Sequence, residues 1–315
     1  MSEPKIPIAV VGATGYAGQV LHALLMHHPR MRPVIVDPRD PADGSAAIAH
    51  ACEAAALALP DDAAHAWTST LRERGVRVLD LSSAHRTTPG FHYGLPELFG
   101  APPSDAAVVS SPGCYPTATL LALLPLVRAQ VIEAGAISVL GCSGTSGAGK
   151  ALRDDLHFSE LHDNCFPYQV GTHKHIPEIE HHLGREVAFV TQLLPIVRGL
   201  IVTAFVRTEH EPARLRDTLV NCYADHPWVT VLDAPGQGLG VRHVVGTHQA
   251  VLAVGPRAHG GLVPVFASID NLLRGAASQA LHTLNLWLGL PAALGLPAPL
   301  ATAPSGVPGM NRALA

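Results

Sequence analysis

Charged side chains are scarce in this sequence, and no stretch of it concentrates charge of one sign. Only 15% of the 315 residues are Asp, Glu, Lys or Arg, the formal net charge is −4 and the pI is about 6.5. Such a chain presents no basic face to a phosphate backbone or to anionic lipid. We therefore expect neither nucleic acid nor a membrane as a partner.

Long apolar runs near the start and paired cysteines are also absent. The stretch MSEPKIPIAVVGATGYAG reaches its glycines after a run too short for a signal-peptide core or a membrane span, which predicts a cytoplasmic protein. Five cysteines without a CxxC pair predict neither a disulfide framework nor a structural zinc site. Four of them are expected to be small buried side chains: Cys52, Cys142, Cys165 and Cys222.

Short β-rich runs alternate with helical stretches in the N-terminal part of the chain. The runs IPIAVV, PVIVD, AAALALP, VRVLDLS and AAVVSSPG predict βαβ units with a parallel sheet, an α/β fold. Beyond about residue 135 come AISVLGCSG, REVAFVTQLLPIV, GLIVTAFVRTEH, HQAVLAVGP and LVPVFASID, with fewer helices between them. These runs predict a second, mixed or antiparallel α+β domain. Residues 275–290 have helical spacing, and a Pro/Gly-rich tail follows.

A glycine-rich loop separates the first predicted strand from the first predicted helix. In VVGATGYAG, the spacing of Gly12, Gly15 and Gly18 is GxxGxxG. Glycines there let the backbone approach a pyrophosphate, which predicts dinucleotide binding in a Rossmann-type domain; a plain turn is the alternative. After the next strand, Asp37 could accept a ribose hydroxyl and Arg39 could pair with a 2′-phosphate, so these residues leave NAD and NADP open.

Cys114 is expected at the N-terminus of the helix that follows the last parallel strand, in SSPGCYPTATLLALLPLV. Helix N-termini stabilise anions and lower the pKa of cysteines placed there, and their amides can hold an oxyanion. Cys114 is therefore the candidate nucleophile, with an inert buried cysteine as the alternative. A thiolate beside a nicotinamide indicates transfer of an acyl group to sulfur and reduction of the thioester by hydride.

That chemistry also needs a proton carrier. In GTHKHIPEIEHHLG, His173 and His175 precede a short helix begun by Pro177. If the segment is extended, both rings point to one face, where either could protonate the aldehyde oxygen or activate the thiol. Metal ligation is the alternative, although no third ligand follows at a recognisable spacing, so no metal is expected.

Several motifs together resemble one known family over nearly the whole chain. In order, GATGYAG, DLSSAHRT, YGLPEL, PGCYPT, GTSGAGK, HKHIPEIE, PIVRG and IDNLLRGAASQALHTLNLWLG are similar to the N-acetyl-γ-glutamyl-phosphate reductases, within the semialdehyde dehydrogenase superfamily. The compact stretch 38–60 resembles the shorter of the family's two forms. The resemblance implies NADPH-dependent reduction of an acyl phosphate to a semialdehyde, with phosphate release, in arginine biosynthesis.

The resemblance also implies roles for individual residues. Cys114 matches the nucleophile, His173 the acid/base residue with His175 beside it, and Arg86 and Arg198 are implied to bind anionic groups of the substrate. Contacts to NADP(H) are implied for two glycine-rich loops and their surroundings: Gly12, Thr14, Gly15, Tyr16, Gly18, Arg39, Ser146, Gly147, Gly149 and Asn271. For Asn271, a helix N-cap is the alternative.

The same resemblance implies the domain organisation. Residues 1–113 and about 286–315 would form a discontinuous NADP-binding domain, and residues 114–285 a catalytic and dimerisation domain. We expect a homodimer or homotetramer acting on a small acyl phosphate.

Three other functions stay open at this point. The first is a reductase of aspartyl phosphate or of a carrier-bound aminoadipyl phosphate. The others are a metal-dependent hydrolase and an NADPH-sensing protein without enzymatic activity.

Overall fold

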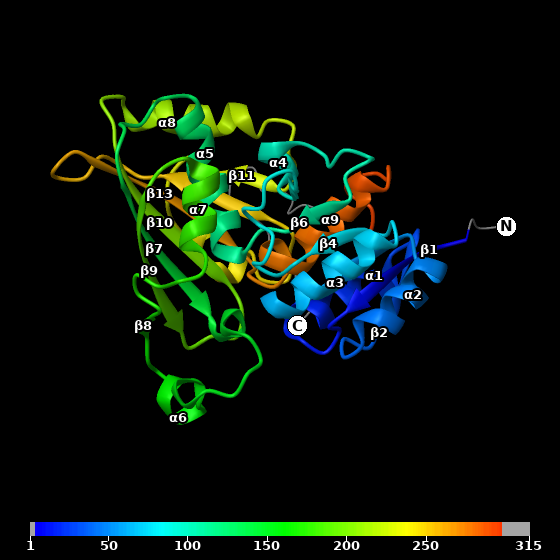
Figure 1. The fold of residues 1–315 in the computed structure, drawn as a ribbon. Coiled ribbons are helices and arrows are strands. Elements are labelled where there is room, and N and C mark those ends of the chain that lie inside the picture. Colours follow the sequence, from blue (N-terminus) through cyan, green and yellow to red (C-terminus); the bar gives the residue numbers. More distant parts are fainter. Residues whose placement is uncertain (1–3, 298–315) are drawn as a thin grey trace. The chain divides into compact units, whose positions relative to one another are not determined.

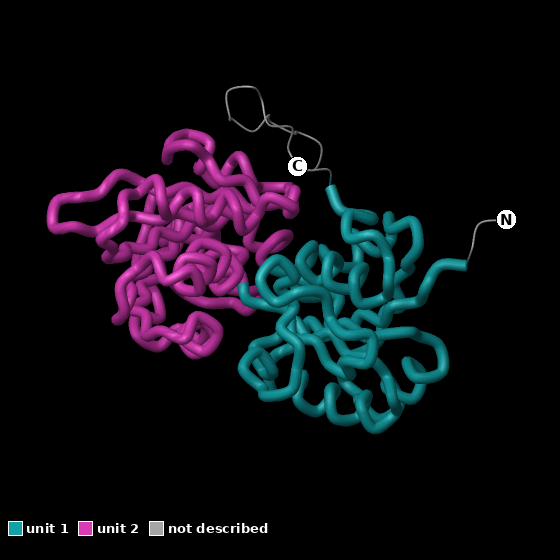
Figure 2. The backbone as a smooth tube through the Cα atoms, turned by 90° about the horizontal axis from the view of Figure 1, so that it is seen from above, with its two compact units in different colours: residues 1–113, 276–297 teal, residues 114–275, 298–315 magenta. Residues whose placement is uncertain are grey.

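The computed structural model describes residues 4–297 and divides them into two compact units. Unit 1 contains the chain up to Gly113 together with Ala276–Pro297, and unit 2 contains Cys114–Gly275 (Figure 2). The sequence placed the return to the first unit near residue 286, whereas the chain returns at Ala276. The reason is that the whole C-terminal helix packs on the sheet of unit 1. The rest of the predicted segment, from residue 298 on, lies outside the described residues.

Unit 1 is built on a six-stranded sheet in which all neighbouring strands are parallel, which confirms the predicted α/β fold (Figure 1). The strand order is β2-β1-β3-β4-β6-β5. The chain places β2 on one side of β1 and β3 on the other, so a topological switch point lies beside β1. The strands are β1 Ile6–Val11, β2 Met31–Val36, β3 Ala54–Leu57, β4 Arg77–Asp80, β5 His92–Tyr93 and β6 Val108–Ser110.

Helices cover both faces of this sheet. Leu21 and Leu281 pack in one core cluster with strand residues such as Ile8. On the other face, Ile48 and Trp67 pack against alternate residues of the same strands. Because both faces are buried, strands such as AAAL are apolar throughout rather than alternating. The helices are α1 Tyr16–His27, α2 Pro41–Ala51, α3 Asp61–Glu73, α4 Pro96–Phe99 and α9 Ser278–Trp287.

Unit 2 is built on a seven-stranded mixed sheet, as predicted. Its order is β11-β12-β13-β10-β7-β9-β8, with β7–β9 and β11–β12 parallel and the other pairs antiparallel. The sequence missed the two three-residue edge strands, β8 and β11. The strands are β7 Ile137–Gly144, β8 Phe166–Tyr168, β9 Val187–Leu194, β10 Leu200–Arg207, β11 Val229–Val231, β12 Ala250–Val254 and β13 Leu262–Ile269.

The three longer helices of unit 2 gather on one face of its sheet. In Figure 1, α5, α7 and α8 lie on one side of the strands, in agreement with their contacts to β9, β10, β12 and β13. Side chains in β9 and β10 accordingly alternate between buried and accessible. The α-helices are α5 Cys114–Arg128, α6 Phe158–Leu161, α7 Ile176–Leu183 and α8 Pro212–Cys222. No helix within residues 4–297 has the length and apolar character to cross a bilayer.

Candidate active site

The three glycines of the first loop have three different surroundings in unit 1. Gly12 has φ +90°, and a Cβ there would collide with the Ala58 carbonyl oxygen just after β3. A Cβ on Gly18 would collide with the Gly12 carbonyl oxygen, so α1 packs tightly on the loop. Gly15 is the N-cap of α1, and a Cβ there would lie 3.7 Å from its nearest neighbour, the Gly12 carbonyl oxygen. Two glycines thus serve the fold, and the phosphate contact predicted for the third stays a prediction.

Asp37 and Arg39, just after β2, bind each other. Arg39 Nε donates to both carboxylate oxygens at 2.9 and 3.0 Å, and the Arg39 amide donates to Oδ1 at 3.0 Å. The Arg39 guanidinium lowers the pKa of the Asp37 carboxyl to about 2. Both side chains are exposed, so Arg39 can turn from Asp37 to a bound phosphate.

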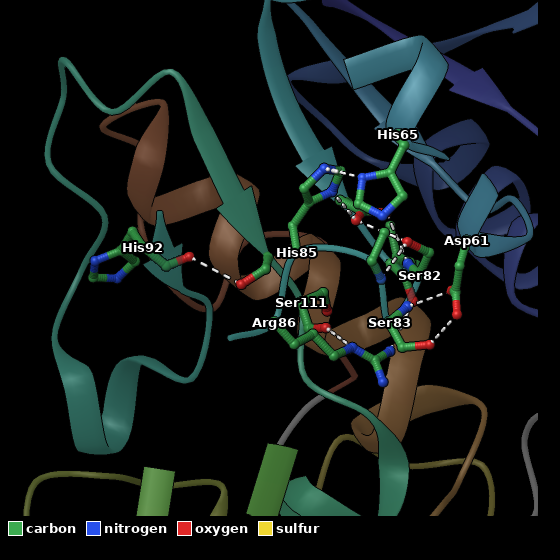
Figure 3. Close-up of polar contacts among 12 residues, drawn as sticks. Asp61, His65, Ser82, Ser83, His85, Arg86, His92 and Ser111 are labelled. Atoms are coloured by element: carbon green, nitrogen blue, oxygen red, sulfur yellow. Dashed lines mark hydrogen bonds and ion pairs between the residues drawn. The ribbon is translucent and has the colours of Figure 1, made fainter. Parts of the chain in front are cut away.

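A polar network occupies the carboxyl end of β4 in unit 1 (Figure 3). Asp80 is fully buried and accepts hydrogen bonds from the amide and hydroxyl of Ser82. Its Oδ2 also lies 2.7 Å from His85 Nδ1, and His85 Nε2 lies 3.1 Å from His65 Nδ1. The motif DLSSAHRT therefore forms a rigid turn rather than an exposed loop.

Arg86 ends this turn and is 7% exposed. Its Nε donates to the Ser111 carbonyl oxygen at 2.9 Å and its Nη2 to the Leu81 carbonyl oxygen at 2.8 Å (Figure 3). The Ser111 amide donates in turn to the Asp80 carbonyl oxygen at 2.7 Å. Arg86 thus holds the chain shortly before Cys114, and its binding to substrate stays a prediction.

Cys114 is the first residue of α5, as the sequence predicted, and is half-buried. The rest of the helix is buried as far as Leu126, which fixes its axis in unit 2. The side chain of the next residue, Tyr115, fills the space where Gly141 of β7 lacks a Cβ, and its hydroxyl donates to the Gly141 carbonyl oxygen at 3.4 Å. The thiol therefore begins a helix that is anchored on the sheet.

Two tyrosines connect Cys114 to the histidines. The Tyr168 hydroxyl donates to the Tyr115 hydroxyl at 3.2 Å, and both rings contact His173, with centroids 5.7 and 5.5 Å away. Burial, and further the charge of a nearby Cys114 thiolate, raise the pKa of Tyr168 to about 12 and that of Tyr115 beyond its usual range. Both phenols therefore stay neutral, and sulfur and imidazole border the same tyrosine pair. The sequence analysis did not single out either tyrosine.

His173 and His175 are both buried, with ring centroids 4.7 Å apart. The prediction that they lie in an extended segment is wrong: His175 has helical dihedral angles and is the N-cap of α7. The turn brings the His175 amide within 3.1 Å of His173 Nδ1, to which it donates. Nδ1 is thus an acceptor, and the proton of neutral His173 resides on Nε2. Burial, with a smaller effect of Lys174, lowers the pKa of His173 to about 4.

The second glycine-rich loop is tied to the end of β13. Asn271 Nδ2 donates to Ser146 Oγ at 2.9 Å, and its Oδ1 accepts from the Gly199 amide at 2.8 Å. The turn that follows β13 is capped by Asp270, whose Oδ1 accepts the Leu272 and Leu273 amides. Asn271 is therefore not the N-cap of this turn. The cofactor contacts predicted for Ser146, Gly147, Gly149 and Asn271 stay predictions.

Arg198 lies beside this loop with a quarter of its side chain exposed. Its Nη1 is 3.8 Å from Oδ2 of the buried Asp270. The absence of a Cβ at Gly144 lets the Arg198 backbone approach β7 closely. The guanidinium is held but still accessible, as an anion-binding residue requires.

The cysteines other than Cys114 are less buried than predicted. Cys165 and Cys222 are exposed because they lie in the loop before β8 and at the end of α8, and Cys52 and Cys142 are half-buried. None of the five forms a disulfide. Within the described residues, no three His, Cys, Asp or Glu side chains gather as a metal site.

Comparisons with known proteins agree with this division of the chain. A family model described as the semialdehyde dehydrogenase NAD binding domain matches residues 36–104, and one described as the semialdehyde dehydrogenase dimerisation domain matches residues 114–271. Aspartate semialdehyde dehydrogenase II of Vibrio cholerae, solved with ASA, covers 91% of this chain and 99% of its own at a TM-score of 0.72 and 17% identity. The enzyme of Candida albicans, solved with NADP, gives a TM-score of 0.66 at 15% identity, over 90% and 98% of the chains.

The fold and the two matching family models define an oxidoreductase of the semialdehyde dehydrogenase class, with an NAD-binding domain in unit 1. Among curated relatives, the N-acetyl-γ-glutamyl-phosphate reductase of Geobacillus thermodenitrificans is 34% identical, over 90% of this chain and 95% of its own. That of Acaryochloris marina is 33% identical, over 94% and 98%. The chain belongs to the N-acetyl-γ-glutamyl-phosphate reductase family, which confirms the resemblance drawn from its motifs.

Proposed function

We propose that this protein reduces N-acetyl-γ-glutamyl phosphate with NADPH to N-acetylglutamate semialdehyde and inorganic phosphate. One observation carries the proposal: a half-buried thiol begins a buried helix and shares a tyrosine pair with a neutral histidine. The names of the curated relatives identify the substrate. The solved aspartate semialdehyde dehydrogenases, below 20% identity, support the fold alone.

Cys114 performs the first chemical step. Its thiolate forms a bond to the acyl carbon, the bond between that carbon and the phosphate oxygen breaks, and phosphate leaves with a proton from solvent. The amides of the first turn of α5 hold the negative charge on sulfur and on the carbonyl oxygen. A bound NADPH would supply the hydride that reduces the thioester carbon, and Cys114 would then leave as the thiolate to release the aldehyde.

His173 acts as a hydrogen-bond donor to the carbonyl oxygen. Its proton is on Nε2 because Nδ1 accepts the His175 amide, and its lowered pKa keeps the ring neutral near pH 7. A neutral donor stabilises an oxyanion without removing the proton of the thiol. This geometry favours donation by His173 over the acid/base exchange that the sequence left open, and it makes His175 the residue that fixes the tautomer.

The residues of unit 1 fit an NADP cofactor, which supplies hydride when bound. The first turn of α1, open at Gly15, would receive the pyrophosphate, and Arg39 would turn from Asp37 to the 2′-phosphate. Thr14 and Tyr16 flank Gly15 in the same loop. In unit 2, Arg198 binds a carboxylate or phosphate of the substrate.

A homodimer forms through the open face of the unit 2 sheet. This face, the one not covered by α5, α7 and α8, carries Val190 and Phe205, each 37% exposed, with Leu140, Ile201 and Phe266 partly accessible. Exposed apolar side chains on adjacent strands favour association, and the same segment matches the dimerisation-domain model. When two subunits use the same face related by a twofold axis, the assembly closes as a dimer and does not grow into an open filament.

The reaction is tested in reverse, by following phosphate-dependent reduction of NADP⁺ with N-acetylglutamate semialdehyde. Cys114→Ser should lower kcat by on the order of 10³-fold or more, because a serine hydroxyl is not ionised there. Cys165→Ser removes an exposed thiol that has no role in the proposed mechanism. This control variant should keep full turnover. Wild-type turnover of Cys114→Ser would refute the nucleophile, and absence of turnover in the wild type with this substrate would refute the function.

A further inference from the structure

The chain between β13 and α9 makes a π-helical turn, Leu273–Ala277. Such turns are rare and occur mostly where the backbone must be displaced for a purpose. Asp270 sets this turn: its carbonyl oxygen accepts the Gly275 amide at 2.9 Å, and its Oδ1 accepts the Leu272 and Leu273 amides at 2.8 and 2.9 Å. Asp270 is fully buried, and its Oδ2 accepts the Gly246 amide as well.

The turn brings Gly275 directly against Cys114. A Cβ built on Gly275 would lie 2.5 Å from the Cβ of Cys114 and 3.0 Å from its Cα, closer than real side chains approach. The next neighbour, Ile269 Cδ1, lies 3.4 Å from the same position, so the close overlap of an added methyl group is with Cys114. The dihedral φ of Gly275 lies outside the left-handed region, so backbone conformation does not demand glycine there. Glycine is needed there because the residue packs directly against Cys114.

We propose that the π-turn is a seat for the nucleophile and that Gly275 is a positioning residue, which sets where the Cys114 sulfur lies relative to the amides of α5. The inference rests on the proposed role of Cys114. Asp270 holds the seat and thereby acts on the thiol through Gly275. Because Cys114 is the first residue of its helix, a push on its Cα also tilts the first-turn amides that stabilise the thiolate.

Gly275→Ala tests the seat, with Gly236→Ala as the matched control. Gly236 belongs to the same unit, has extended backbone and has no atom within 4 Å of an added Cβ. A merely structural account predicts that the overlap of the added methyl group with Cys114 lowers Tm and leaves the pH profile of Cys114 alkylation unchanged. The seat predicts that kcat and the alkylation rate of Cys114 fall together by on the order of 100-fold, as expected for a displacement near 1 Å.

Three measurements separate positioning from loss of fold. Alkylation by iodoacetamide is followed as a function of pH on the Cys114 peptide by mass spectrometry, since other cysteines also react. Its pH profile should move to higher pH in Gly275→Ala, while NADPH affinity, which belongs to unit 1, stays within error; Tm, which the overlap with Cys114 lowers, should stay above the assay temperature. Should Gly275→Ala not fold, Asp270→Asn, which leaves Gly275 and Cys114 unaltered but weakens the cap, should move the profile in the same direction.

A wild-type alkylation profile in folded Gly275→Ala, or in folded Asp270→Asn where Gly275→Ala does not fold, overturns the seat. This failure differs from failure of the proposed function. If only the positioning role of Gly275 is wrong, Cys114→Ser is inactive while Gly275→Ala is active. If the proposed function is wrong, Cys114→Ser itself is active.

Discussion

At the scale of single residues, the role proposed for His173 depends on which of its ring nitrogens carries a proton. The His175 amide occupies Nδ1, and burial lowers the pKa of the ring from 6.5 to about 4. The folded protein therefore binds fewer protons than the unfolded chain between these values. Neutral His173 contributes stability that is fully present above pH 6.5 and is lost as the pH falls through about 4.

Substitution of His173 can distinguish a donor from an acid/base group. His173→Gln places an amide N–H where the Nε2 proton lies but cannot exchange protons, whereas His173→Leu removes the donor. We expect His173→Leu to lower kcat by about 10²- to 10³-fold and His173→Gln to keep most of it. The kcat–pH profile of the wild type should show no His173 step near 6.5, only a decline toward pH 4. Equal loss in both variants would instead support proton exchange.

At the scale of elements, three glycines of one loop divide the work of folding and binding. Gly12 and Gly18 allow contacts that any side chain would prevent, while an added Cβ on Gly15, at the start of α1, would make only an ordinary van der Waals contact. The GxxGxxG spacing predicts the loop but not this division, because the contacts depend on where β3 and α1 lie in the fold.

Alanine substitution at two of these glycines should affect two different properties, NADPH binding and thermal stability. Gly15→Ala is expected to leave Tm unchanged and to weaken NADPH binding about 10-fold or more, since a methyl group would meet the pyrophosphate. Gly12→Ala should lower Tm, because alanine is strained at φ +90° and meets the Ala58 carbonyl oxygen. Fluorescence titration with NADPH and thermal unfolding measure the two effects. A large fall in Tm for Gly15→Ala would contradict the division.

Elements with a strong local signal could be predicted from the sequence, and those set by distant contacts could not. Helix α5 starts at Cys114 because Pro112 and Gly113 break the preceding strand and a long apolar run follows. His173 and His175 were misplaced because their turn depends on the start of α7 and on packing against Tyr115. The contact of the π-turn with Cys114 could not be predicted, because the two segments are far apart in the sequence.

At the scale of the whole molecule, the open face of the unit 2 sheet is the surface that association would cover. Phe205 of β10 and Val190 of β9 stand on this face, whereas Val220 of α8 stands on the helical side. Val220 is 38% exposed, which makes it comparable to Phe205 at 37%.

A charge on the open face should therefore separate the subunits. Phe205→Asp is expected to convert the dimer to a monomer, because the carboxylate would be buried without a partner. Val220→Asp, equally exposed on the opposite side, should leave the dimer intact. Sedimentation velocity gives the mass of each variant. A Phe205→Asp dimer with wild-type stability would exclude this face, and a wild-type tetramer would show that a second surface is also used.

The contact between Gly275 and Cys114 bears on how such a chain can be rearranged. Within residues 4–297, unit 2 is one uninterrupted segment whose first and last residues touch. A segment of this kind can be removed or transplanted as a cassette, because a short bridge from Gly113 to Ala276 reseals the nucleotide-binding unit without stretching either end. The described chain thus enters and leaves unit 2 at one point, and Cys114 lies at that point.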